Sequence, residues 1–310
     1  MSRFSVLFER LAIDVVKECD VEGASRPRLG WDEAWHLMDR AVARGLQRKP
    51  HVVPARIGVD EKAAGRGPDY ITVVSNIDTG TVDYLADERR QTSLHGFFDK
   101  CSAEERKRIA AVAMDMWDPY ITSTRDHLDN ADQKIVFDPY HLMKYLTGAV
   151  DTVRKQENRA LAAAGDKSLS KTKYLWLYSA ENLPERHQDR FAILRSGNLK
   201  TARAWAIKES LRHLWAYKRR GWGEKHFRRW YLWATHSRQQ PVIDAARTLK
   251  RHEAGLMSYF AHGVINAGAK RLNSRIQAIR VSARGYRNRE HFKTAIWFHL
   301  GGLELYPTTP

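Results

Sequence analysis

The sequence predicts a mixed α/β protein in which a helix-covered sheet is interrupted by a long helical stretch. Apolar and polar residues alternate with a period of two in three stretches between residues 56 and 86, which is typical of strands. Segments with helical periodicity then separate two further short apolar runs, an order that places a sheet beneath helices. From residue 160 to residue 250 the strand pattern is lost and the composition shifts toward Trp, Arg and Lys, which indicates a helical insertion.

Two amphipathic segments open the chain. Residues 4–19 and residues 31–46 each place apolar side chains at helical spacing, and Gly30 separates the two segments. Residues 1–50 are therefore either the helical remnant of a helix-turn-helix DNA-binding region or a pair of helices that packs on a neighbouring element. Pro54 lies in the linker that ends this segment.

The elements that follow come in an order typical of one fold. The pattern predicts an antiparallel meander of three strands, over residues 56–62, 70–77 and 82–86. It then predicts, in turn, a helical stretch over 92–108, a strand over 109–115, a helix over 119–130, a strand over 134–138 and a long helix from about residue 140. This βββαβαβα order is that of a ribonuclease-H-like fold, in which the first and fourth strands lie side by side.

The charge is concentrated in one part of the chain. Lys and Arg number 52 against 36 Asp and Glu, for a formal net charge of +16, and residues 200–293 alone hold 22 Lys and Arg and 5 Asp and Glu. This excess predicts a polyanionic partner. Five tryptophans lie among the basic residues of the helical stretch, and we expect at least three of them to be core. The basic residues proposed to contact DNA there are Arg219, Arg220, Arg228 and Arg229.

Composition excludes several classes of protein. Cys19 and Cys101 are the only cysteines and form no C-x-x-C pair, which excludes a disulfide framework and a cysteine-built zinc site. No apolar run approaches the ~20 residues that a membrane span needs. We therefore expect a protein of a reducing, cytoplasmic compartment with no membrane partner.

Two aspartates stand where an apolar strand ends in a charge. Asp60 closes the apolar half of the first strand, and Asp115 follows the run Ala110-Ala-Val-Ala-Met114. If the first and fourth strands are neighbours, the two carboxylates approach each other, and a divalent cation would relieve their repulsion. That pairing is the basis of two-metal phosphoryl transfer, although plain strand-end acids are the alternative. Asp138, which ends the next strand, is either a site acid or the N-cap of the helix that starts at Pro139.

Five motifs, taken in chain order, resemble one known family. They are Ile57-Gly-Val-Asp-Glu61, Val112 to Tyr120, Lys134-Ile-Val-Phe-Asp138 with His141, Asn198-Leu-Lys-Thr-Ala-Arg-Ala-Trp205, and Asn266 to Gln277 with Arg284-Gly-Tyr-Arg-Asn288. Together they cover about residues 5–307 and are similar to the ISL-three family of bacterial insertion-sequence transposases.

The resemblance implies a DDE catalytic domain formed by residues 54–160 and 251–310, with residues 161–250 as a basic helical insertion. It implies that Asp60 and Asp115 are catalytic, metal-binding acids and that two Mg²⁺ or Mn²⁺ ions serve the active form. The implied reaction is cleavage of DNA at the element's ends and transfer of the cut strand to target DNA. The implied assembly is a homodimer on DNA, associated with the bacterial nucleoid. A C-terminal track for the transferred strand would use Arg271, Arg275, Arg280 and Arg284.

The sequence departs from the family's pattern at two places. The family's third acid is Glu, and Lys270 stands at the matching position. An ammonium group cannot ligate a cation and competes for the same carboxylates, so we expect strand cleavage reduced by orders of magnitude. The family's N-terminal zinc-binding segment does not precede residues 4–19, so we expect a truncated copy. The alternative function is a catalytically silent DNA-binding protein that occupies element ends or inhibits an active transposase.

Overall fold

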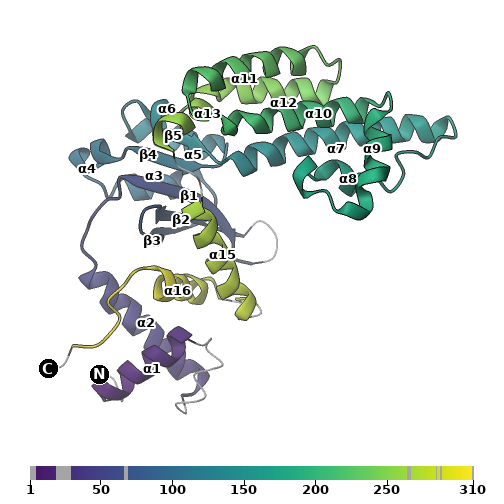
Figure 1. The fold of residues 1–310 in the computed structure, drawn as a ribbon. Coiled ribbons are helices and arrows are strands. Elements are labelled where there is room, and N and C mark those ends of the chain that lie inside the picture. The colour runs from purple at the N-terminus through teal and green to yellow at the C-terminus, as the bar shows by residue number, and fades with distance from the viewer. Residues whose placement is uncertain are drawn as a thin grey trace. The chain divides into compact units, whose positions relative to one another are not determined.

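The computed structural model describes residues 5–18, 29–65, 69–263, 267–283, 285–286 and 288–308, with the backbone alone for 267–270. The chain divides into two compact units (Figure 1). The first contains residues 1–135 and 264–310, and the second contains residues 136–263.

A five-stranded mixed sheet forms the centre of the α/β part. Its strands are β1 (Arg56–Ala63), β2 (Tyr70–Asn76), β3 (Thr81–Asp87), β4 (Ala111–Met114) and β5 (Ile135–Phe137). The strand order is β3-β2-β1-β4-β5, with β1 antiparallel to β2, β2 antiparallel to β3, and β1 parallel to β4. The predicted meander and the predicted adjacency of the first and fourth strands are therefore confirmed, as is the mixed α/β, ribonuclease-H-like fold class.

The helices of the first unit come from both ends of its sequence. They are α1 (Val6–Glu18), α2 (Trp31–Arg48), α3 (Gln91–Phe98), α4 (Ala103–Arg108), α5 (Asp118–His127), α6 (Ala131–Lys134), α15 (Ala267–Ser282) and α16 (Arg289–Leu300). Helices α15 and α16 cover one face of the meander (Figure 1). Their apolar cluster joins strand and helix residues, namely Ala64, Ile71, Val73, Val82, Leu272, Ile276, Phe292, Ile296 and Leu300.

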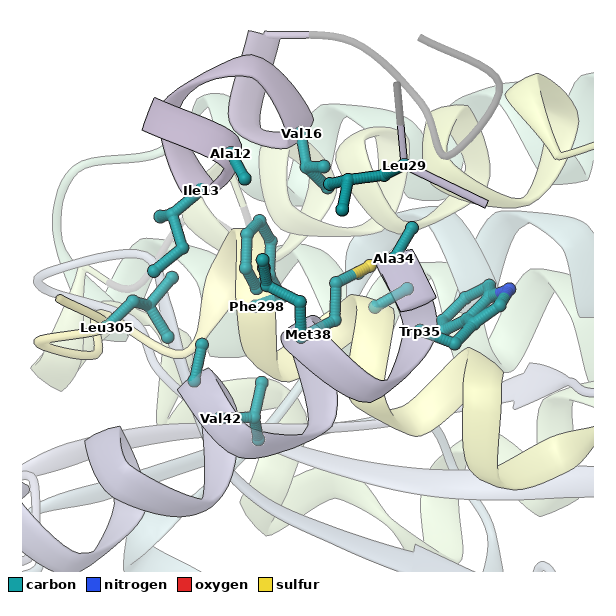
Figure 2. Close-up of a cluster of buried hydrophobic side chains, with 13 residues drawn as sticks. Ala12, Ile13, Val16, Leu29, Ala34, Trp35, Met38, Val42, Phe298 and Leu305 are labelled. Atoms are coloured by element: carbon teal, nitrogen blue, oxygen red, sulfur yellow. The ribbon is translucent and has the colours of Figure 1, made fainter. Parts of the chain in front are cut away.

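The N-terminal helices pack against the C-terminal part of the same unit. Figure 2 shows Ala12, Ile13 and Val16 of α1 meeting Met38 of α2 and Phe298 of α16. Both helices thus pack on α16, which agrees with the second interpretation of this segment. The burial is partial, because Leu7 and Leu11 of α1 are 80% and 54% exposed. A DNA-binding role for residues 1–50 stays a prediction.

The second unit is helical throughout its described elements from residue 138 onward. It contains α7 (Pro139–Ala163), α8 (Lys173–Leu177), α9 (Gln188–Ser196), α10 (Lys200–Arg212), α11 (Arg220–Thr235), α12 (Gln240–Arg251), α13 (Glu253–Met257) and α14 (Tyr259–His262), with three short 3₁₀ turns. The loss of strand pattern after residue 160 therefore did indicate helices.

The expectation that at least three of the five tryptophans are core is wrong. Only Trp205 and Trp230 are buried, Trp215 is half-buried, and Trp222 and Trp233 are 54% and 43% exposed. The reason lies in α11, whose buried face is supplied by Gly223, Phe227, Trp230 and Ala234. That face leaves the side chains at positions 222 and 233 outside.

Candidate active site

The strand register brings the two predicted acids to neighbouring positions. Gly58 of β1 pairs with Ala113 of β4 in a parallel arrangement. Continuing this register by two residues places Asp60 level with Asp115, the residue that follows β4. Neighbouring strands lie about 4.8 Å apart, so the two residues are adjacent although 55 positions separate them in the sequence. Both side chains are partly exposed, at 23% and 27%.

Successive residues of β1 serve opposite faces of the sheet. Asp60 pairs with Val73 of β2, and Val73 belongs to the apolar cluster that α15 and α16 cover. Glu61 pairs with Thr72, whose Oγ1 lies 2.8 Å from the Oη of Tyr120 on α5. Because side chains alternate along a strand, Asp60 lies on the α15 side and Glu61 on the α5 side.

Among the described residues, three donors hold the Asp60 carboxylate. The backbone N–H of Glu61 donates to Oδ1 at 2.8 Å, and Lys62 Nζ donates to Oδ2 at 2.9 Å. The side-chain amide of Asn273, on α15, donates to the same Oδ2. Asp60 is thus fixed from its own strand and from a helix more than 200 residues away in the sequence.

Asp115 is held by its own turn and by an arginine. The backbone N–H of Met116 donates to its Oδ1 at 2.7 Å, and Arg89 lies 3.9 Å from its Oδ2. Arg89 also pairs with Glu61 at 2.9 Å and stacks over the ring of Trp117, with its Cζ 4.1 Å from the ring centroid. These contacts limit the orientations open to the guanidinium beside Asp115.

A buried tyrosine, Tyr120 of α5, lies on the face of the sheet that carries Glu61. Burial raises the pKa of Tyr120 far above its ordinary value, and the negative charge of Glu61 and Asp60 acts in the same direction. Tyr120 is fully buried and hydrogen-bonds Thr72, so it stays protonated and acts as a neutral structural partner.

The position expected to carry the third acid lies on α15. Lys270 is part of this helix, and its side chain falls outside what the structure describes. Among the side chains of α15 that the structure describes, Asn273 donates to Asp60; it lies three positions after Lys270 and therefore on the same helical face. Sequence analysis missed a role for Asn273, and this i, i+3 spacing is the signal that would have found it.

Other acids near the end of the chain and after β5 are engaged locally. Asp138 accepts a hydrogen bond from the backbone N–H of Tyr140 at 2.9 Å, which makes it the N-cap of α7. Glu290 pairs with Lys293 at 2.7 Å at the start of α16. Within the described ranges, no group of three or more His, Cys, Asp or Glu side chains is placed to hold a metal ion. That Asp60 and Asp115 hold a divalent cation stays a prediction.

The basic residues proposed to contact DNA are mostly on the surface. Exposed members are Arg219, Arg220, Arg228, Arg229, Arg271 and Arg275. Arg220 pairs with Glu224 at 2.7 Å, and Arg275 donates to the carbonyl of His299 at 3.3 Å. Arg280 is half-buried, and Arg284 lies outside the described residues.

The sheet order and helices define a ribonuclease-H-like protein, in which one acid lies within β1 and a second follows the neighbouring parallel strand β4. A family model described as a transposase, that of the DDE transposases of the ISL-three type, matches residues 57–296. The chain therefore belongs to the ISL-three family of insertion-sequence transposases.

Individual relatives agree with this assignment. The chain is 26% identical over 300 residues to the transposase for insertion sequence element IS1001 of Bordetella parapertussis, which covers 94% of this chain and 73% of that protein. It is 27% identical over 307 residues to the transposase for insertion sequence element IS1557 of Mycobacterium tuberculosis, which covers 91% of this chain and 68% of that protein. In the part of the chain that the structure describes, no helix combines the length and the apolar character that crossing a bilayer requires.

Proposed function

We propose that this chain carries the DNA cleavage and strand-transfer site of an insertion-sequence element at Asp60 and Asp115, and that Lys270 impairs it. The observation that carries the proposal is the β1–β4 register, which sets the two acids level on adjacent strands. Bound between these carboxylates, Mg²⁺ or Mn²⁺ would supply Lewis acidity to a scissile phosphodiester, with two ions in the active form.

The chain's own residues prepare the carboxylates for this role. Backbone N–H groups hold one oxygen of each aspartate, at 2.8 Å for Asp60 and 2.7 Å for Asp115. Fixing one oxygen orients the other, and partial exposure leaves the pair accessible to solvent and substrate. Lys62 and Arg89 place positive charge beside the acids, where a phosphate group would also be attracted.

Helix α11 presents a surface suited to nucleic acid. Trp222, Lys225, Arg229 and Trp233 share one flank of the helix at spacings of three and four residues, and Lys225 Nζ lies 5.3 Å from the centroid of the Trp222 ring. The two exposed aromatic rings can stack on bases, while the basic side chains contact phosphates. We propose that this flank, with Arg219, Arg220 and Arg228 beside it, binds DNA.

Lys270, at the position of the family's third acid, should determine the rate of DNA strand cleavage. With Lys270 in place of Glu, two acids must hold the cations alone, and the ammonium competes for the same carboxylates. We expect plasmid nicking in Mg²⁺ or Mn²⁺ to be slower by orders of magnitude than in the Lys270→Glu variant. Lys167→Glu, which makes the same charge change at an exposed site in the second unit, is the matched control and should leave nicking unchanged.

Adding Asp60→Asn to Lys270→Glu should abolish nicking, because it removes half of the carboxylate pair. Equal nicking by the unaltered chain and by Lys270→Glu would refute the impairment. Nicking that survives Asp60→Asn and Asp115→Asn would refute the site itself.

A second function, silent DNA binding that occupies element ends or inhibits an active transposase, is favoured by the residue at position 270. It predicts duplex binding with a steep salt dependence and no nicking by any of these variants. Arg275→Glu and Arg280→Glu should lower affinity and flatten the slope of log affinity against log salt. An unchanged slope would show that these arginines of α15 do not contact DNA phosphates.

A further inference from the structure

Asn273 is a side chain of α15 that contacts the candidate active site. Its amide donates to Asp60 Oδ2, and the two residues are 213 positions apart in the sequence. Asn273 is half-buried, whereas its neighbours Arg271 and Ser274 are exposed. Leu272 and Ile276 already cover the sheet from α15, so Asn273 is not needed for that packing. Its hydrogen bond to Asp60 therefore indicates a role in the site.

The packing of α15 fixes where Asn273 lies. Leu272 and Ile276 are 3% and 1% exposed and insert into the apolar cluster on β2 and β3. These two anchors flank Asn273 along the helix, so the helix cannot turn without exposing them. Asn273 is consequently held over β1 by the same contacts that hold α15 on the sheet.

The hydrogen bonds at Asp60 Oδ2 show what must change when a cation binds. Lys62 and Asn273 both donate to this oxygen, and a divalent cation needs the same lone pairs. The Lys62 ammonium group carries only hydrogen-bond donors and cannot ligate a cation, so it must move away from Oδ2 when the cation binds there. Asn273 has both a donor and an acceptor on one planar group, and rotation about its Cβ–Cγ bond is soft.

We propose that Asn273 is the third oxygen ligand of the site, turning its Oδ1 toward the cation held by Asp60 and Asp115. Amide carbonyl oxygens are ordinary ligands of hard divalent cations. A neutral ligand here supplies coordination without the charge of the family's Glu, so binding is weaker than in a three-carboxylate site. The inference rests on the proposed function, because it requires the two aspartates to bind the cation.

The first test is a Mn²⁺ titration of the full chain without DNA, followed by electron paramagnetic resonance. Asn273→Leu should weaken Mn²⁺ binding about tenfold, as expected for loss of one ligand or its support, and Asn273→Asp should tighten it. Gln277→Leu removes an exposed amide one turn further along α15 and should change nothing. An affinity for Mn²⁺ that is the same in Asn273→Leu and in the unaltered chain would overturn the inference.

The second test distinguishes a ligand from a residue that only alters the local charge or structure. Asn273→Cys should give a Cd²⁺–thiolate charge-transfer absorption above that of the unaltered chain, because the thiolate would coordinate the ion directly. Gln277→Cys is the matched control and should show none. Absence of the band in Asn273→Cys, in protein that still binds Cd²⁺, would overturn the proposal even if the leucine variant fails to fold.

Failure of the inference and failure of the proposed function give different results. If Asp60→Asn with Asp115→Asn leaves Mn²⁺ binding unchanged, the aspartate site is wrong and the role of Asn273 falls with it. If that double variant abolishes Mn²⁺ binding while every Asn273 variant binds as the unaltered chain does, only the role of Asn273 is wrong.

Discussion

A buried ion pair fastens the N-terminal helices to the C-terminal segment, and breaking it should destabilise the first unit. Glu9 of α1 is 4% exposed, and Arg44 of α2 donates to its Oε1 at 2.9 Å. Arg44 also donates to the carbonyl of Leu305 at 2.6 and 3.1 Å. One guanidinium thus joins three segments: α1, α2 and the chain end.

The magnitude follows from which group is left without its partner. Arg44→Met leaves the Glu9 carboxylate buried with Arg40, 3.8 Å away, as its remaining cation among the described residues, and loses both bonds to Leu305. Removing one partner of a buried pair costs about 3–5 kcal/mol, and because Arg44 is 21% exposed we expect about 2–4 kcal/mol here. Replacing both partners, Glu9→Leu with Arg44→Met, should lie within about 1 kcal/mol of the unaltered chain.

Urea unfolding followed by circular dichroism measures these differences. The matched control is the exposed pair Glu104 and Lys107, 2.7 Å apart with side chains 73% and 62% exposed. Lys107→Met should cost less than about 0.5 kcal/mol, since exposed pairs contribute little. The prediction is wrong if Arg44→Met lowers the free energy of unfolding no more than Lys107→Met does. It is also wrong if the loss in the double variant equals the sum of the losses in Glu9→Leu and Arg44→Met.

Three further predictions concern the site, the second unit and pH. Lys62→Gln removes an ammonium from the paired carboxylates and should tighten Mn²⁺ binding about fivefold, as an ion pair of about 1 kcal/mol implies; an unchanged titration would show that it does not compete. Gly255→Ala would make a Cβ overlap with the ring of Phe137 and should lower the free energy of unfolding by about 1–3 kcal/mol, whereas Gly148→Ala on α7, where the space is open, should cost nothing. Burial and neighbouring cations lower the pKa of His299, so the folded state binds its proton less readily than the unfolded state does. Stability from this residue is complete above pH 6.5, the ordinary pKa, and is lost as pH falls toward the lowered value; the dependence should flatten in His299→Phe, and an identical pH profile would contradict the assignment.

The local pattern of the sequence was enough to predict the sheet and the place of its two acids. Alternation with a period of two marks which residues belong to a strand, and a charge after an apolar run marks where the buried part ends. The sequence pattern predicts Asp60 and Asp115 in this way. Their proximity also depends on β1 and β4 being neighbouring strands, which is a property of the sheet's topology. The excess of positive charge and the loss of strand pattern after residue 160 are likewise properties of composition.

Tertiary packing decided which side chains share the site and which helix faces are covered. Asn273 meets Asp60 because Leu272 and Ile276 anchor α15 on the sheet. The spacing from Lys270 marks the helical face on which Asn273 lies, but the packing of α15 decides that this face meets β1. Helical periodicity does not show how much of a helix surface its neighbours cover, which is why at least three of the five tryptophans were expected in a core and only Trp205 and Trp230 are buried. A sequence specifies what each residue can bind, but contacts between residues 200 positions apart depend on how the elements between them pack.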